Sequence, residues 1–147
     1  MKFSKWFMVL LPALCCCGMN IEQPQNEIKE VEIGIDRSYE EVSNYELVWE
    51  TIFDIEEEHY YVYFYSTTCN HCLEIKNYII EKALSRGDIY FVKGTSKDNL
   101  TNDSKKLIGA ENPNDFYILG YPTLGLISNK KCTKNLSGTT QIKAELK

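Results

Sequence analysis

The fold is decided by residues 60–72, which have the sequence YYVYFYSTTCNHC. The stretch opens with six aromatic or β-branched residues in a row, a pattern typical of a strand covered on both faces, as in a parallel sheet. Such rings could instead stack on bases or sugars, but a strand core is the better interpretation because both faces of an interior strand are covered. Two cysteines with two residues between them, Cys69 and Cys72, follow the strand directly.

An amphipathic helix and a second strand follow the cysteines. Residues 68–86 place apolar side chains on one helical stripe, and Gly87 stands where a helix C-cap glycine belongs. Residues 88–92, DIYFV, then predict a second strand. The result is a βαβ unit of about 30 residues with a right-handed crossover.

The position of the two cysteines predicts redox chemistry. A thiolate at Cys69 would face the unpaired N–H groups and the positive end of the helix dipole, which favour the ionised and nucleophilic form of a cysteine. Cys72 lies one turn further along the helix, within reach of the first sulfur, and can resolve a mixed disulfide by intramolecular attack. We therefore expect Cys69 to be the exposed attacking thiol and Cys72 the resolving thiol.

A metal site is the alternative for the same motif. Structural zinc takes four ligands, and the other candidates, His59 and Cys132, are not paired at ligand spacing. A redox dithiol is therefore preferred to zinc, copper or another soft metal, and no metal ligand is predicted. We interpret Cys132 as a small apolar filler in a strand, with a regulatory thiol as the alternative, and His59 as a surface residue.

The flanking segments complete the predicted secondary structure. Ser38 and Glu41 have the spacing of a capping box, and apolar residues at helical period then predict a helix over about 39–54. Residues 95–113 are polar and hold at most one helix, around 104–108. The chain then predicts a strand at 124–127, a turn at 129–131, a second hairpin strand at 132–136 and a closing helix at 139–146.

This order of elements resembles the thioredoxin family over about residues 39–146, with Gly120-Tyr121-Pro122-Thr123 before the closing hairpin. The resemblance implies an α/β thioredoxin fold, in which a βαβ unit is followed by a ββα unit around a mixed central sheet, with an N-terminal helix. In that family the proline is cis and lies against the cysteine motif, and the residue before it offers its backbone to an extended substrate. Pro122 and Tyr121 are thereby implied as substrate-binding residues. The Tyr121 ring is expected in the substrate groove, with simple packing as the alternative.

Two departures from thioredoxin itself bear on the chemistry. Thioredoxin has an acid six residues before the first cysteine, whereas this chain has Tyr63, so the buried carboxylate that would help deprotonate the resolving thiol is missing. His71, directly before the second cysteine, resembles the histidine of DsbA-type oxidants, which stabilises the first thiolate. We therefore count His71 with the catalytic residues and expect a fairly oxidising couple, because a stabilised dithiol form raises the reduction potential.

The first 19 residues resemble a signal peptide or a lipoprotein or membrane anchor. Lys2 and Lys5 precede nine apolar residues, 6–14, a run too short to span a bilayer but suited to a secretory signal. Three cysteines follow, of which Cys17 fits a lipid-attachment site better than Cys15 does. The expected location is extracytoplasmic, on the outer face of the cytoplasmic membrane, with secretion as the second possibility.

Charge divides the rest of the chain. Residues 20–58 hold 13 acidic and two basic residues, and 20–37 are interpreted as an acidic spacer before a domain at 38–147. The lysines after His59 are scattered, unlike the dense basic face that nucleic-acid binding needs, so no nucleic-acid partner is expected.

The predicted function is thiol–disulfide exchange with thiols or disulfides of exported proteins, through Cys69 and Cys72, without a cofactor and with an unknown redox partner. The alternative is a tethered, non-catalytic thioredoxin-like binding or assembly module.

Overall fold

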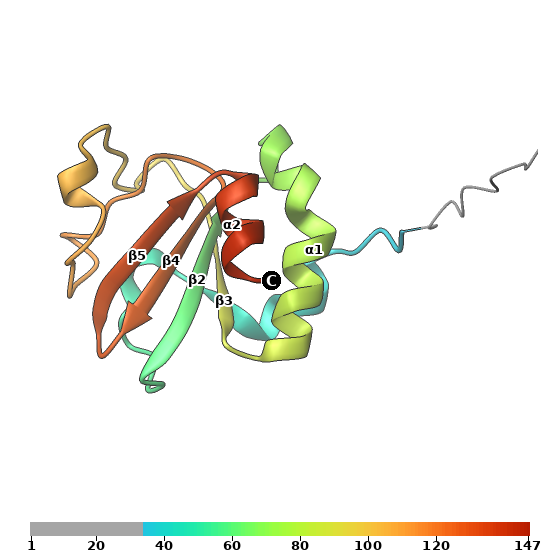
Figure 1. The fold of residues 1–147 in the computed structure, drawn as a ribbon, viewed down its shortest axis with the longest axis horizontal. Helices are drawn as coiled ribbons and strands as arrows, with labels where there is room; N and C mark the ends of the chain where they lie inside the picture. Colours follow the sequence, from blue (N-terminus) through green and yellow to red (C-terminus); the bar gives the residue numbers. More distant parts are fainter. Residues whose placement is uncertain (1–33) are drawn as a thin grey trace, which may run out of the picture. The chain divides into compact units, whose positions relative to one another are not determined.

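A computed structural model describes residues 34–147, which form one compact unit around a five-stranded sheet with strand order β1-β3-β2-β4-β5 (Figure 1). The strands are β1 Glu46–Leu47, β2 His59–Tyr65, β3 Ile89–Lys93, β4 Thr123–Ser128 and β5 Lys131–Ser137. β1, β3 and β2 are parallel, whereas β4 is antiparallel to β2 and β5 to β4. This βαβ unit followed by a ββα unit is the thioredoxin fold, and the predicted fold class is confirmed. The predicted anchor, with Cys15 and Cys17, and residues 20–33 of the predicted spacer lie outside the described residues.

β2 is the central strand, as its aromatic sequence predicts. It pairs with β3 on one side and with β4 on the other, so that Tyr63 lies between Phe91 and Leu124. Residues of β2 alternate between two cores, with Tyr63 on one face of the sheet and Phe64 on the other. The strand that precedes the cysteines is therefore fixed on both edges and both faces.

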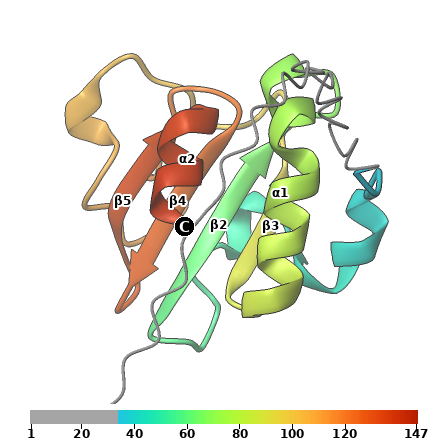
Figure 2. The same cartoon turned by 45° about the vertical axis from the view of Figure 1, so that its right-hand side comes forward.

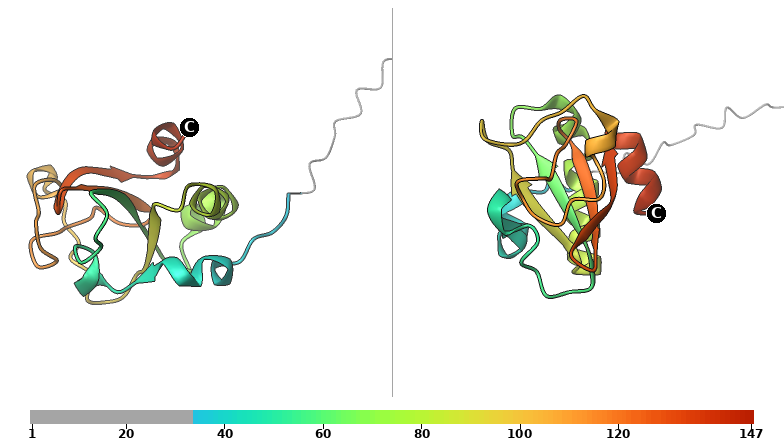
Figure 3. Two further views of the ribbon diagram at one scale, coloured as in Figure 1. Left: turned by 90° about the horizontal axis from the view of Figure 1, so that it is seen from below. Right: turned by 90° about the vertical axis from the view of Figure 1, so that its left-hand side faces the viewer.

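Two helices cover one face of the sheet (Figure 2). α1, Asn70–Arg86, buries Cys72, Ile75, Ile79, Ile80 and Ala83, and it ends at Gly87 with a left-handed φ of 79°. α2, Thr139–Glu145, lies beside α1 on the same face, as the left view of Figure 3 shows. The Tyr78 hydroxyl of α1 donates a 3.1 Å hydrogen bond to the Leu146 carbonyl oxygen and joins the two helices. Neither helix has the length and apolar composition that crossing a bilayer requires.

The hairpin between β4 and β5 turns at Asn129 and Lys130, which both have positive φ, 50° and 60°. Two successive positive φ values match the twist of a tight hairpin. The predicted strand, turn, strand and closing helix are all confirmed.

The predicted helix over 39–54 is wrong. The segment forms two short 3₁₀ helices, η1 Tyr39–Tyr45 and η2 Trp49–Thr51, with β1 between them. Only its start is as expected, because Ser38 and Glu41 form the predicted capping box. Strand β1 adds to the edge of the sheet, so this segment passes from one face to the other.

That passage explains the misleading period of apolar residues. Val42 of η1 is buried on the α1 face, whereas Ile52 and Phe53 are buried on the opposite face. The same spacing of apolar residues is typical of one face of a helix. Only the pairing of β1 at the sheet edge distinguishes a continuous helix from a segment that crosses between the two faces.

A long irregular segment, 94–122, covers the face opposite α1 together with η2. It contains the single 3₁₀ turn η3, Ser104–Lys106, near the predicted short helix. Phe116 is fully buried there and packs against Phe64 of β2, with ring centroids 5.2 Å apart. The Asn99 side-chain amide donates to the Phe116 carbonyl oxygen at 3.1 Å, which holds the two arms of the segment together. This segment ends at Pro122, so the packing of the segment sets the position of that proline.

Candidate active site

Cys69 lies at the junction of β2 and α1. It is the N-cap residue of α1, and its backbone N–H donates to the Ser66 carbonyl oxygen at 3.3 Å. Its sulfur accepts a hydrogen bond from the Cys72 backbone N–H at 3.4 Å. The first amide groups of a helix have no partner within the helix, and here one of them is directed at the sulfur. The start of α1 therefore directs a backbone donor at the Cys69 sulfur.

Cys72 lies one turn further on and is fully buried. Burial, together with the neighbouring Cys69 sulfur, raises the pKa of its thiol to about 12. The backbone of Ser66 and the phenol of Tyr63 act in the opposite direction and lower this pKa. Both cysteines are free thiols in the structure, the first half-buried and the second inaccessible. The pair thus has the predicted asymmetry of one reachable and one internal sulfur.

The peptide bond between Tyr121 and Pro122 is cis, as the family resemblance implies. The Cys69 thiol donates a 3.4 Å hydrogen bond to the Tyr121 carbonyl oxygen, so the segment before the proline lies directly against the cysteine motif. Hydrogen bonds on both sides fix this segment. Thr123 Oγ1 donates to the Gly120 carbonyl oxygen at 2.7 Å, and the Gly138 N–H donates to the Pro122 carbonyl oxygen at 3.0 Å.

The side chain of Tyr121 packs against the start of the 94–122 segment, which agrees with the packing alternative. Its hydroxyl donates a short hydrogen bond to the Asp98 carboxylate, and its ring covers Gly94 so closely that a Cβ on that glycine would lie 2.5 Å from the ring. Burial and the Asp98 hydrogen bond raise the pKa of Tyr121. The ring is thus fixed to the start of the 94–122 segment. Sequence reasoning missed Asp98 and Gly94, because neither belongs to a local motif with Tyr121.

His71 is exposed and contacts a carboxylate on α1. Its side chain is 71% exposed, and its Nδ1 lies 3.2 Å from a Glu74 carboxylate oxygen, one turn along α1. The structure therefore places this predicted residue next to the motif but pairs it with a carboxylate rather than with a cysteine.

Cys132 and His59 lie apart from the pair. Cys132 is buried in the core on the opposite face of the sheet, where its thiol donates to the Leu107 carbonyl oxygen at 3.4 Å. Burial raises the pKa of this thiol to about 12. His59 is exposed at the start of β2. Within residues 34–147 no group of three or more His, Cys, Asp or Glu side chains is placed to hold a metal ion.

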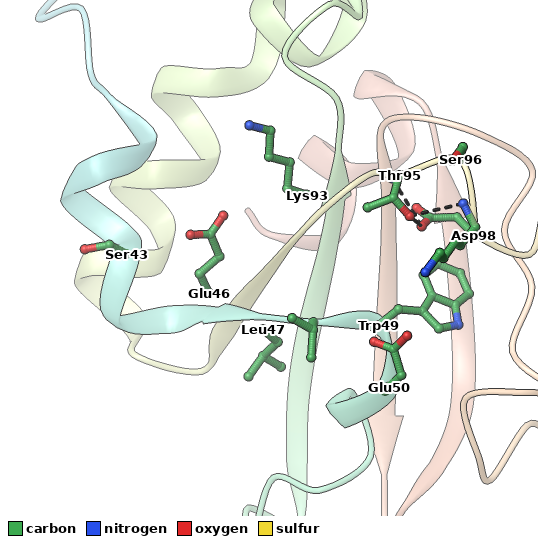
Figure 4. Close-up of a pocket in the computed structure, with 11 residues that line it drawn as sticks. Ser43, Glu46, Leu47, Trp49, Glu50, Lys93, Thr95, Ser96 and Asp98 are labelled. Carbon is green, nitrogen blue, oxygen red and sulfur yellow. Dashed lines mark hydrogen bonds between the residues drawn. The ribbon is translucent and has the colours of Figure 1, made fainter.

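A separate pocket of about 650 Å³ lies at the β1 edge of the sheet (Figure 4). Side chains of β1, η2, the end of β3 and residues 95–98 line it, among them Glu46, Trp49, Lys93 and Asp98. It does not include the cysteines, but Asp98 belongs both to this pocket and to the contact with Tyr121.

No protein-family model matches the sequence, and no curated protein matches it. Similar solved structures include thioredoxin f2 of Chlamydomonas reinhardtii, with 21% identity, a TM-score of 0.45, and 69% of this chain and 90% of that chain covered. The oxidised thioredoxin from Plasmodium falciparum has 20% identity and a TM-score of 0.44, with 67% and 86% covered. Mitochondrial thioredoxin 3 of Saccharomyces cerevisiae has 16% identity and a TM-score of 0.44, with 68% and 88% covered. The fold of this chain is assigned from its own strand order and cis-proline, not from these likenesses.

Proposed function

We propose that this protein is a thiol–disulfide oxidoreductase that works through Cys69 and Cys72. The observation that carries the proposal is the setting of the Cys69 sulfur. It accepts the N–H of Cys72 at the start of α1 and donates to the carbonyl oxygen before the cis-proline. A reactive thiol, a resolving thiol and a backbone segment against which a peptide can lie therefore meet at one point.

The exchange balances without a cofactor. The Cys69 thiolate attacks a substrate disulfide, the substrate S–S bond breaks, and one substrate sulfur leaves as a thiolate that takes up a proton. Cys72 then gives up its proton and attacks the Cys69 sulfur of the mixed disulfide, which releases the second substrate thiol. Two electrons pass from the dithiol to the substrate, and the reverse sequence oxidises a substrate dithiol.

The surface beside Cys69 suits an extended protein segment. Leu73 follows one turn later on α1 and is 52% exposed, and Leu119, two residues before Tyr121, is 45% exposed. Leu73 thus leaves apolar surface open near Cys69, and Leu119 leaves it open near the Tyr121–Pro122 segment in the sequence. The substrate class that we propose is therefore a protein cysteine in an unfolded or flexible segment.

We further propose that the couple is oxidising. A Cys69 thiolate supported by a helix-terminal N–H favours the dithiol form, and each ~1.4 kcal/mol of such support raises the reduction potential by ~30 mV. A glutathione redox titration tests this. A potential near or below ~−270 mV, the value of thioredoxin, would exclude the oxidising couple and leave exchange itself in place.

The proposed substrates are cysteines of exported proteins. This part rests on the composition of residues 1–19, which has the form of a signal or anchor. Cell fractionation and palmitate labelling of the full chain, compared with Cys17→Ser and Cys15→Ser, tests it. Recovery of an unlabelled protein in the cytoplasmic fraction would contradict both export and lipidation.

A second candidate is a tethered binding module, and one observation favours it. With a pKa of about 12, the Cys72 thiol is ionised in only about one molecule in 10⁵ at neutral pH, which makes it a weak nucleophile. Such a pair could be vestigial.

Insulin reduction and reoxidation of reduced ribonuclease discriminate the two functions. An oxidoreductase loses both activities when Cys69 and Cys72 are replaced by serine, and it keeps them in the control Cys132→Ala, whose thiol lies in the other core. A double-serine variant as effective as the wild type would establish the binding module instead.

A further inference from the structure

Two buried tyrosine hydroxyls in the core around Cys72 lack hydrogen-bond partners, which lowers the stability of the fold. The hydroxyl oxygens of Tyr39 and Tyr63 are buried, and no atom of residues 34–147 meets hydrogen-bond geometry with either of them. A buried polar group without a partner costs about 1–3 kcal/mol, so such groups are rare without a reason. The neighbouring tyrosine, Tyr65, does have a partner, because its hydroxyl donates to a Glu46 carboxylate oxygen at 3.2 Å.

The three tyrosines form one stacked group on the α1 face of the sheet. The Tyr65 ring stacks on Tyr39 with centroids 3.9 Å apart, and on Tyr63 with centroids 6.1 Å apart. Tyr63 and Cys72 are fully buried in the same core, and Tyr39 packs against it. The rings are thus fixed by packing, and the two unpartnered hydroxyls belong to the same cluster of side chains as the buried thiol.

The Tyr63 phenol acts on the acidity of Cys72, and both phenols respond to charge on that thiol. The Tyr63 hydroxyl lies near enough to the Cys72 thiol to lower its pKa, and charge on Cys72 raises the pKa of Tyr63 and of Tyr39. Burial is the main reason that the pKa of Tyr39 reaches about 12 and that of Tyr63 is raised. Both phenols therefore keep their protons at neutral pH and are available as donors.

No other side chain of the described residues takes the place of Tyr63 as a donor that lowers the pKa of Cys72. The titratable groups that interact with Cys72 are Cys69 of α1, Tyr63 of β2, Tyr39 of η1, and Tyr121 before the cis-proline. No carboxylate or cation of the described residues is among the groups that shift the pKa of Cys72. Among residues 34–147, the side-chain O–H that lowers this pKa is that of Tyr63.

We propose that Tyr63 is the hydrogen-bond donor to the Cys72 sulfur in the resolving step, and that Tyr39 is a positioning residue that donates to the Tyr63 oxygen. The inference rests on the proposed exchange function. It adds the group that allows the buried Cys72 thiol to attack the mixed disulfide. When Cys72 attacks, its S–H bond breaks and the proton passes to the departing substrate thiolate. The Cys69 bond to the substrate sulfur breaks as the bond between the two cysteines forms. The phenol proton stays on the Tyr63 oxygen throughout.

The test uses a disulfide reagent that reports each step separately. Ellman's reagent reacts with Cys69 and releases one coloured thiolate, and attack by Cys72 on the mixed disulfide releases a second. The full chain carries Cys15→Ser, Cys16→Ser, Cys17→Ser and Cys132→Ala, so that only the proposed pair reacts. Stopped-flow absorbance then gives two rates at each pH.

Tyr63→Phe removes only the hydroxyl. We expect the second phase to slow about tenfold at every pH from neutral upwards, which displaces the plot of log rate against pH by about one unit, while the first phase is unchanged. Tyr65→Phe is the matched control on the same strand and face, and its second phase should equal that of the parent. A role in packing alone would change the melting temperature and leave the second phase as it is.

Tyr39→Phe is the second variant, because Tyr39 lies at the edge of the core and its loss is tolerated even if Tyr63→Phe does not fold. We expect a smaller slowing, of about two- to fivefold, confined to the second phase. A second phase that matches the parent in every folded variant of Tyr63 and Tyr39 overturns the inference alone. If the parent itself releases one thiolate and not two, Cys72 does not resolve, and the proposed function fails.

Discussion

The thiol of Cys69 donates a hydrogen bond to the carbonyl oxygen of Tyr121, although 52 residues separate the two in the chain, with 3.4 Å between sulfur and oxygen. The contact joins the start of α1 to the segment before the cis-proline. It also connects the sulfur indirectly to Asp98, because the Tyr121 side-chain hydroxyl donates a hydrogen bond to that carboxylate. The reactivity of the thiol should therefore depend on residues far from the cysteine motif.

Removal of the resolving sulfur should trap a substrate. In Cys72→Ser the mixed disulfide on Cys69 cannot be resolved by the second thiol, so covalent adducts with cysteine-containing proteins should accumulate on non-reducing gels. Cys132→Ser is the control, because that residue is buried in the core on the other face and should give no adduct. Equal adduct levels in the two variants would mean that Cys72 has no part in resolution.

Gly94→Ala should displace the ring of Tyr121. The added Cβ would lie 2.5 Å from the ring, a distance at which one of the two must move. Overpacking of this kind costs about 1–3 kcal/mol, measured as the free energy of unfolding in urea. Gly34→Ala is the matched control, since nothing lies within 4 Å of its Cβ and it should be neutral. The rate of Cys69 alkylation should change in the first variant only, and equal rates in both would show that the ring does not position the Tyr121 carbonyl.

Tyr121→Phe should destabilise the fold, because the Asp98 carboxylate loses its phenol donor. Hydrogen bonds to charged groups contribute about 1.5–3 kcal/mol, and the partial exposure of this pair places the expected loss at the lower end. Tyr117→Phe, in the same irregular segment, is the comparison, since its ring lies beside Lys106, with the ammonium 5.1 Å from the ring centre. Urea denaturation should separate the two variants by about 1 kcal/mol or more, and identical midpoints would contradict the role of the Asp98 contact.

Alkaline pH should destabilise the reduced protein more than the oxidised one. The folded state keeps the Cys72 proton up to a pKa of about 12, whereas the unfolded thiol loses it near 9.0. Above about pH 9 the unfolded chain therefore binds fewer protons, and stability falls by up to ~1.4 kcal/mol per pH unit for this thiol. The Cys132 thiol is free in both redox forms, so its contribution to the pH dependence of stability is the same in each. Urea denaturation between about pH 8 and about pH 10 should show the steeper loss in the reduced form, and parallel lines would contradict the raised pKa of Cys72.

His71→Ala should change the reduction potential little. Because the ring is paired with Glu74 on the exposed side of α1, we expect a fall of less than ~30 mV in a glutathione titration, corresponding to less than ~1.4 kcal/mol. Glu74→Gln, which frees the ring, serves as the companion variant. A larger fall in His71→Ala would show that the ring leaves Glu74 and stabilises the Cys69 thiolate.

Local patterns in the sequence were sufficient for much of the fold. The aromatic run of β2, the stripe of α1 with Gly87 at its end, and the two turn residues at 129 and 130 each follow from hydrogen bonding and packing within a few residues. The cysteine pair belongs to the same class, since its spacing and its place after a strand put the first sulfur at a helix N-terminus.

What the sequence determined by itself is thus the set of local elements and the two sulfurs at the start of α1, because these depend on neighbours along the chain. The tertiary structure decided the rest. It placed residues 39–54 on both faces of the sheet, fixed the Tyr121 ring to Asp98, and left the hydroxyls of Tyr63 and Tyr39 unpartnered beside Cys72. These contacts join residues that are distant in sequence, and which of many similar polar and aromatic side chains meet is settled only when the whole core packs.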